Sequence, residues 1–137
     1  MAATFRCTIV TPSESLLDEE VTYVNLPAWD GQTGVMAATS PFLTKLGAGV
    51  VQIEGSGGRK QFVLDSGFAQ MQGGALTLLV DKAVAATTID SKQAETELAA
   101  ANARAVEATG AGLDERDRIE RAQRLAAAKV AVSRRGR

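Results

Sequence analysis

The amino-acid composition changes sharply near Thr87, and this change constrains the fold more than any single motif does. All aromatic residues and all three prolines lie before this position, in short apolar runs separated by turn-forming residues. After it the chain consists mostly of Ala, Glu, Arg, Lys, Leu, Gln and Val, among which strong helix formers dominate. The change predicts a β-domain over residues 1–87 and a helical segment over residues 88–137.

The first segment has the pattern of a small all-β domain. Candidate strands fall at residues 4–11, 20–26, 34–37, 49–54, 59–65, 67–72 and 75–80. The sequence GSGG at residues 55–58 and the pair Gly73-Gly74 separate neighbouring strands and predict hairpin loops. Some strands carry apolar residues on both faces, which predicts two stacked sheets with a partner covering one outer surface.

The second segment predicts two helices. Asp90 followed by Gln93 forms a variant capping box and predicts a helix over residues 91–108. Residues 109–112 would form the turn, and Asp114 would cap a second helix that ends near Val132. The facing positions would be small or apolar residues, namely Leu98, Ala101, Ala105 and Ala108 in the first helix and Ile119, Ala122, Leu125, Ala126 and Val130 in the second. Since an Ala-rich seam buries little area, at about 25 cal/mol per Å², this antiparallel hairpin should be marginally stable and able to move.

The composition argues against most kinds of catalysis. The chain has no histidine, which removes the commonest general base and the commonest metal ligand. No carboxylates are spaced for a metal site. The net charge of -1 gives no general attraction to nucleic acid or to anionic lipid. We therefore predict no catalytic residue, no metal and no cofactor.

The single cysteine and the N-terminal sequence bear on the redox compartment and on membrane targeting. Cys7 has no partner for an internal disulfide, which favours a reducing compartment and a buried, inert thiol. The N-terminus lacks a charged region followed by an apolar stretch, and the chain has no run of about 18 apolar residues. We expect neither a cleaved signal nor a membrane-spanning segment.

Three glycine-containing stretches resemble functional loops only superficially. Gly47-Ala48-Gly49 lacks the third glycine of a dinucleotide fingerprint, and GSGGRK at residues 55–60 lacks the spacing of a phosphate loop. Asp65-Ser66-Gly67 has no partner base. We interpret all three as turns between strands.

The arginines of the last predicted helix allow three interpretations. A solvated helix face would pair Asp117 with Arg121 and Glu120 with Arg124, each pair contributing roughly a few tenths of a kcal/mol. A cationic surface would instead dock on an acidic protein surface. RNA binding is the third interpretation, but no aromatic residue follows Phe68 to stack on a base.

The region from Val24 to Ile53, VNLPAWDGQTGVMAATSPFLTKLGAGVVQI, has a distinctive order of motifs. A G-x-x-G turn at residues 31–34 leads to a small-residue stretch that ends at Pro41, and a Leu-Thr-x-Leu-x-x-Gly-Val segment follows at residues 43–50. Together with the later stretch FVLDSGFAQMQGGALTLLVDKAV, this order resembles the epsilon subunit of bacterial rotary F-type ATP synthases. The resemblance covers essentially the whole chain.

The resemblance implies an α+β fold, with a β-sandwich of about ten strands followed by an antiparallel two-helix hairpin. It implies a noncatalytic central-stalk subunit that couples proton-driven rotation of the c-subunit ring to ATP synthesis, with the gamma subunit, the c-ring and the alpha and beta subunits as partners. No nucleic acid is implied, and membrane contact is indirect, through the complex. The absence of a recognisable transit peptide favours a bacterial protein, peripheral on the cytoplasmic side of the plasma membrane.

The resemblance also implies roles for particular residues. One sheet face and edge would pack on gamma, and the extended hairpin would inhibit ATP hydrolysis. The implied c-ring contact consists of Trp29, Asp30, Gly31, Gln32 and Thr33, and the implied contact with an acidic segment of beta consists of Arg116, Arg118, Arg121 and Arg124.

Two departures from the family pattern carry expectations of their own. Some relatives bind ATP through an [IL]-D-x-x-R-A motif, which reads Ile89, Asp90, Gln93 and Ala94 at the defined positions here. Because Gln93 replaces the arginine, and Lys92 would project about 100° away on a helix, we predict weak or absent ATP binding. Where many relatives have Pro-Gly-His-Ala-Pro, this chain has AATSP at residues 37–41, and Pro41 should preserve the turn.

Two other classes of protein share the features read from the residues. A standalone interaction module would combine a β-sandwich with a helical hairpin in the same way, and copurification of gamma and c subunits would distinguish it. An enzyme has the least support, because no convergent polar set accompanies the missing histidine.

Overall fold

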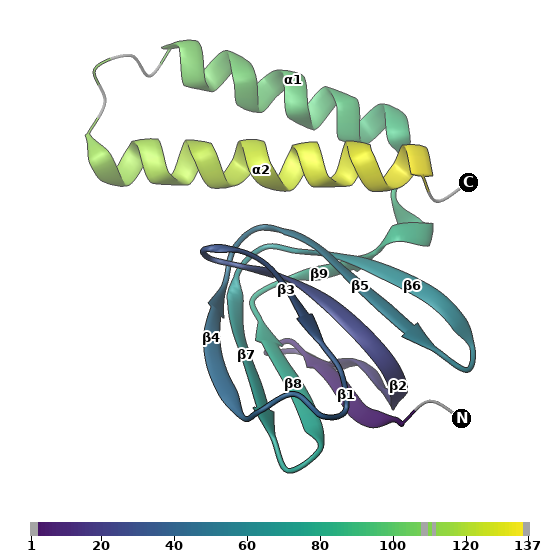
Figure 1. Ribbon diagram of the computed structural model, residues 1–137. Coiled ribbons are helices and arrows are strands. Elements are labelled where there is room, and N and C mark those ends of the chain that lie inside the picture. Colours follow the sequence, from purple (N-terminus) through teal and green to yellow (C-terminus); the bar gives the residue numbers. More distant parts are fainter. Residues whose placement is uncertain (1–2, 108–109, 111, 136–137) are drawn as a thin grey trace.

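The computed structural model of the chain describes residues 3–107, 110 and 112–135. A β-sandwich is followed by two antiparallel helices that lie across one end of it (Figure 1). The strands are β1 (Phe5–Val10), β2 (Ser15–Ala28), β3 (Gly31–Val35), β4 (Phe42–Leu46), β5 (Gly49–Gly55), β6 (Gly58–Leu64), β7 (Gly67–Gln72), β8 (Ala75–Val80) and β9 (Ala83–Ala85). A short 3-10 helix, η1 (Ala86–Thr88), leads into α1 (Ser91–Glu107) and α2 (Leu113–Arg135).

The long strand β2 joins the two layers of the sandwich. Its first half pairs with β1, and its second half pairs with β3 and β5. The register of β2 against β5 shifts between Val21 and Tyr23, where a bulge lets the strand bend. One layer therefore contains β4, β7, β8 and β1 with the start of β2, and the other contains β3, β5, β6 and β9 with the end of β2.

Alternation along each strand fills the space between the layers. In β1 the side chains of Phe5, Cys7 and Ile9 are buried while the residues between them are not. The core also contains buried residues from both layers, among them Leu26, Leu46, Ile53, Leu64, Leu76 and Leu78. This core belongs to the sandwich, because none of the helix residues that the structure describes takes part in it.

The strand predictions were mostly confirmed, with differences at the edges. Nine strands are described where the family resemblance implied about ten. β4 and β9 were not predicted; they are short, at five and three residues, and nonlocal partners β7 and β6 define them. β2 continues through Pro27, where the prediction ended at residue 26. Proline lacks only the N–H donor, and its carbonyl accepts a hydrogen bond from the Gly47 amide at 2.8 Å.

The helix limits follow their capping groups. Asp90 caps α1, because its Oδ1 accepts a hydrogen bond from the Lys92 amide at 2.9 Å. The predicted cap of α2 was wrong: the Arg116 amide donates to the Gly112 carbonyl, so the helix begins one residue before Asp114. Asp114 lies in the first turn, where its charge favours the helix dipole. The predicted turn over residues 109–112 and the facing residue Ala108 fall partly or wholly outside the described residues.

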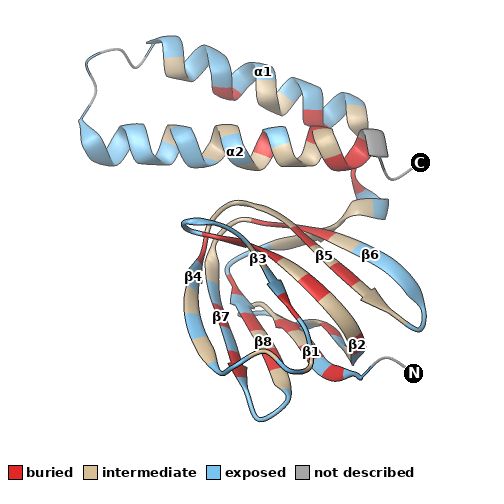
Figure 2. Ribbon diagram, in the orientation of Figure 1, coloured by how far each residue is buried: buried red, intermediate tan, exposed pale blue. Residues whose placement is uncertain are grey.

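The hairpin rests on the sandwich at one end only. α2 lies between α1 and the strands β5 and β6 (Figure 1). The contact, here called the hairpin interface, is a second apolar cluster separate from the sandwich core, and its buried members are Val63, Ile89, Ala94, Val130 and Val132. The end of the hairpin nearest its loop is almost entirely exposed (Figure 2). Docking therefore depends on the last half of α2.

Candidate functional site

The β2–β3 connection is a tight turn with an exposed tryptophan at its tip. Ala28 pairs with Gly31, so only Trp29 and Asp30 lie between the strands. The Trp29 side chain is 69% exposed although it is large and apolar. The expected contact loop of residues 29–33 is thus shorter than the sequence suggested, since Gly31 already begins β3.

Backbone contacts hold this turn against the neighbouring β4–β5 turn. The Trp29 amide donates to the Lys45 carbonyl at 3.0 Å. Gly31 has φ +134°, a conformation that residues with a side chain rarely adopt. A Cβ on Gly49 would lie 2.8 Å from the Pro27 Cβ, so the close approach of the two turns requires a glycine there. The backbone of Trp29 is therefore held in place by the β4–β5 turn, while its side chain remains exposed.

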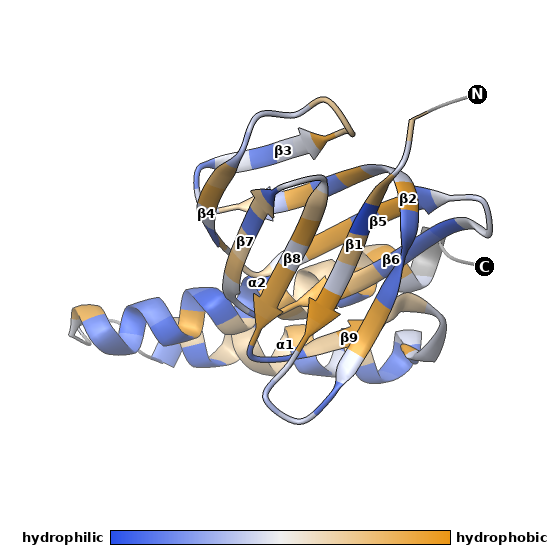
Figure 3. Cartoon of the chain, turned by 90° about the horizontal axis from the view of Figure 1, so that it is seen from below, coloured by the Kyte–Doolittle hydropathy of each residue, from blue (hydrophilic) through white to orange (hydrophobic). Residues whose placement is uncertain are grey.

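The outer face of the β4-β7-β8-β1 layer carries an exposed apolar strip, defined as Val10, Leu43, Phe68 and Leu79. Cross-strand pairing aligns Phe68 with Leu79, and Leu79 with Val10. Phe68 and Leu79 are each 53% exposed, and Leu43 is 70% exposed. Val10, Phe68 and Leu79 also line a shallow cleft of about 470 Å³. Seen from below, β8 and the end of β1 show the hydrophobic colour (Figure 3).

The sequence analysis expected a covered outer face but did not name these residues. A usable signal was present in β8, where Leu78, Leu79 and Val80 are consecutive. Because side chains alternate between faces, one of three adjacent apolar residues in a strand must point away from the core. Here that residue is Leu79, and its partner Phe68 is likewise exposed whereas the next residue in β7, Ala69, is buried.

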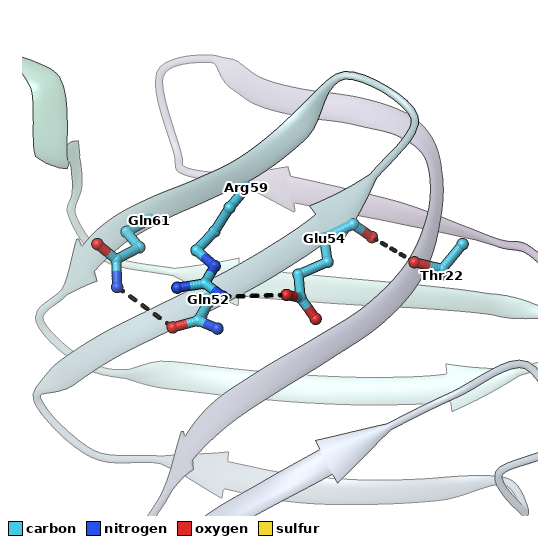
Figure 4. Close-up of polar contacts among 5 residues, drawn as sticks. All are labelled: Thr22, Gln52, Glu54, Arg59 and Gln61. Carbon is cyan, nitrogen blue, oxygen red and sulfur yellow. Dashed lines mark hydrogen bonds and ion pairs between the residues drawn. The ribbon is translucent and has the colours of Figure 1, made fainter. Parts of the chain in front are cut away.

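The outer face of the opposite layer is polar beyond the part that the hairpin covers. Gln61 Nε2 donates to Gln52 Oε1 at 3.3 Å, and Arg59 pairs with Glu54 at 3.4 Å across the β5–β6 ladder (Figure 4). Thr22 Oγ1 donates to the Glu54 carbonyl at 3.0 Å. These side chains form hydrogen bonds or ion pairs with one another while partly exposed, so this part of the face has little to gain from apolar burial.

The residues of the degenerate nucleotide motif serve the fold. Ile89 and Ala94 are buried in the hairpin interface, and Asp90 caps α1. Gln93 is exposed beside a small cleft of about 140 Å³. Lys129 of α2 also lines this cleft, and its Nζ pairs with Glu97 Oε2 of α1 at 3.1 Å.

The four arginines predicted to act together point to different surroundings. Arg121 and Arg124 line a cleft between α2 and the sandwich, whereas Arg118 lines another near the hairpin loop with Arg104. Arg116 lines neither of these two clefts. The predicted pairs within α2 were wrong: the ion pairs among the described side chains join Arg6 to Asp18, Arg59 to Glu54, Lys60 to Glu19 and Lys129 to Glu97.

Among the described residues Arg6, Cys7 and Asp18 have clearly shifted pKa values, and the hydrogen bond to Asp18 raises the pKa of Arg6. Burial raises the pKa of the Cys7 thiol to about 12, with a further contribution from the Glu19 charge. The Arg6 hydrogen bond, at 2.6 Å, holds the pKa of Asp18 below its usual value. Among the described residues, no three Cys, Asp or Glu side chains gather in a way that would hold a metal ion. No described helix is both long enough and apolar enough to cross a bilayer.

Comparison with known sequences gives a consistent result. Residues 4–86 match the family described as ATP synthase, Delta/Epsilon chain, beta-sandwich domain. The ATP synthase epsilon chain of Sinorhizobium medicae is 35% identical over 121 residues, which cover 88% of each chain. The ATP synthase epsilon chain of Rhodopirellula baltica is 34% identical over 96 residues, 70% of this chain and 75% of the relative.

The fold is also found in a solved assembly. A chain in the cryo-EM structure of the Euglena gracilis mitochondrial ATP synthase, OSCP/F1/c-ring in rotational state 1, superposes with a TM-score of 0.81. The match covers 96% of this chain and 82% of that one, at 24% identity. The similarity extends past the sandwich, because so large a share of the chain includes the helices.

Proposed function

The chain belongs to the family of ATP synthase delta and epsilon chains, and from this premise we propose that it is the rotor subunit that couples c-ring rotation to ATP synthesis. It is noncatalytic by itself, as the epsilon chain is. Its work is to bind gamma on one side and the c-ring on another, so that torque passes through shape complementarity. We place it peripherally on the cytoplasmic side of a bacterial plasma membrane, held there through its partners.

The apolar strip is the single observation that carries this proposal. Val10, Phe68 and Leu79 of the strip are in register across β1, β7 and β8, and Leu43, Phe68 and Leu79 are exposed. The outer face of the other layer is polar where the hairpin does not cover it. A continuous apolar row of this kind typically marks a protein interface. We assign it to gamma, because a stable stalk needs an interface that excludes water at its centre.

The Trp29-Asp30 turn supports the assignment of the c-ring contact. An exposed tryptophan on a fixed turn offers a large contact area at little entropic cost. Asp30 beside it is exposed and suited to a polar partner loop. In this proposal Gly31 shapes the turn, while Gln32 and Thr33 of β3 flank the contact.

The exposed half of the hairpin supports a regulatory role. The hairpin rests on a small apolar interface, and the loop half of α2 carries arginines that form no ion pair in the described structure. We propose that the hairpin extends and places Arg116, Arg118, Arg121 and Arg124 against an acidic segment of beta, which inhibits ATP hydrolysis.

Replacing Phe68 and Leu79 together with serine tests the docking role. Both side chains point outward, so the variant should fold with an unchanged thermal midpoint but lose binding to purified gamma. Met36→Ser is the matched control, because Met36 is a comparably exposed apolar residue, 59% exposed, outside the strip. Equal binding of gamma by both variants and the original chain would contradict the assignment.

Deleting residues 90–137 tests the regulatory role separately. We expect the assembled complex to keep its subunits and to hydrolyse ATP faster when the hairpin is missing. If hydrolysis by the assembled complex is unchanged, the hairpin has no inhibitory role and only the docking function stands.

A further inference from the structure

A cleft of about 290 Å³ separates the first half of α2 from the sandwich. On the sandwich side it is lined by three turns that meet at one end of the strands: the β2–β3, β4–β5 and β6–β7 turns. On the helix side it is lined by residues at positions 117, 120, 121 and 124, which share one face of α2. This part of the hairpin therefore faces the sandwich without packing on it.

Asp65, in the β6–β7 turn, lines this cleft and has an unsatisfied carboxyl oxygen. Its Oδ1 is buried and has no hydrogen-bond partner. The Asp65 amide is used, since it donates to the Lys82 carbonyl at 3.1 Å, so the turn is held in place. A buried carboxylate oxygen without a partner is costly, and a nearby cation would relieve that cost.

The cations that line the cleft from the helix side are Arg121 and Arg124. Neither takes part in an ion pair among the described residues, although Asp117 and Glu120 lie within one turn of them on α2. Both side chains are exposed. Arginine can bind a carboxylate through two parallel N–H donors, and the length of its side chain lets it reach across a narrow gap.

The geometry points to a latch in which Asp65 accepts hydrogen bonds from Arg121 or Arg124 and holds the first half of α2 on the sandwich. When the latch closes, the hairpin is attached at two places, the hairpin interface and the cleft. When it opens, only the hairpin interface remains, as described here. The latch is a property of this chain alone and does not depend on any partner.

Lys45 is the competing partner for Asp65, because it lines the same cleft from β4. A pair between Lys45 and Asp65 would lie within the sandwich and would not restrain the helix. The acidic side chains of Asp117 and Glu120 act against closure, since they face the same cleft as Asp65 and carry the same charge.

Hydrogen exchange of the full chain, followed by mass spectrometry over residues 113–124, tests the latch. Asp65→Asn and the double variant R121Q/R124Q should each speed exchange there by about three- to tenfold, the range expected for a partly buried charged hydrogen bond. R116Q/R118Q is the matched control, because it removes the same charge from the same helix away from the cleft. It should change exchange by less than about twofold.

Combining Asp65→Asn with R121Q/R124Q distinguishes a direct contact from independent effects. If the groups form one latch, the combined variant exchanges no faster than the faster of its parents. Multiplied effects, or an equal effect of R116Q/R118Q, would overturn the proposal. It would also fail if Lys45→Gln reproduced the effect of Asp65→Asn while R121Q/R124Q had none.

Discussion

Replacing Val63 with alanine should release the hairpin while leaving the sandwich folded. Val63 is 1% exposed, yet it belongs to the hairpin interface and not to the sandwich core. The substitution removes two methyl groups, each worth about 0.8 kcal/mol, and leaves a small cavity, for a total of about 2 kcal/mol. Because this loss applies to the docked state of the helices, it should raise their amide exchange by up to about 30-fold.

Val51→Ala is the matched control, because Val51 pairs across the ladder with Phe62, next to Val63, but points into the sandwich core. It should weaken protection in both parts of the chain, as expected when the core is damaged. Exchange measured by mass spectrometry over α1, α2 and the strands distinguishes the two variants. If Val63→Ala lowers protection in β1, β7 and β8 as much as in the helices, the hairpin and the sandwich unfold as one unit and the reasoning is refuted.

Three further predictions follow from single positions or clefts. Gly67→Ala should prevent normal folding, because the new Cβ would lie 2.1 Å from the Leu79 carbonyl oxygen, whereas Gly57→Ala meets nothing within 4 Å and should change the denaturation midpoint little. If Gly67→Ala kept the midpoint of the original chain, β7 and β8 could move apart at this position at little cost, which would contradict the prediction. Cys7 stays protonated in the folded chain up to its pKa of about 12. An unfolded thiol ionises near about 8.5, so the contribution of Cys7 to stability should be complete below that pH and fall above it by about 1.4 kcal/mol per pH unit. Denaturation of the original chain and of Cys7→Ala at pH 8 and pH 10 measures the difference, and an equal pH response in both would contradict it. Titration calorimetry of the full chain with ATP should show no binding at micromolar concentrations, because Lys129 is the only cation among the described residues that line the cleft beside Gln93, and it is already paired with Glu97. Tight binding would overturn this.

The sequence predicted the fold class well because local signals agreed with it. Turn glycines, alternating apolar residues and the change of composition each indicated the same arrangement, and the facing residues of the helices, such as Ala101 and Ala126, are buried as expected. β4 and β9 were missed for a physical reason. A strand of three to five residues has too few positions for a period to be read, and its existence depends on a partner strand distant in sequence.

The candidate site was less accessible from the sequence. The apolar strip depends on the register between β1, β7 and β8, which sequence periodicity does not reveal. The four arginines share a residue type but not a surface, because their positions along α2 place Arg118 and Arg121 beside different clefts. The unsatisfied Asp65 oxygen could not be predicted from the sequence, because the cleft that Asp65 lines is formed by three turns that are distant in sequence.

The central claim is that this chain is a rotor subunit of an ATP synthase, and affinity purification tests it most directly. The tagged full chain would be isolated from detergent-solubilised native membranes, and the copurifying proteins would be identified by mass spectrometry. We predict recovery of the gamma, c, alpha and beta subunits with the original chain, and their loss when Phe68 and Leu79 are both replaced with serine. Recovery of none of these subunits by the original chain would contradict the account and favour a standalone interaction module.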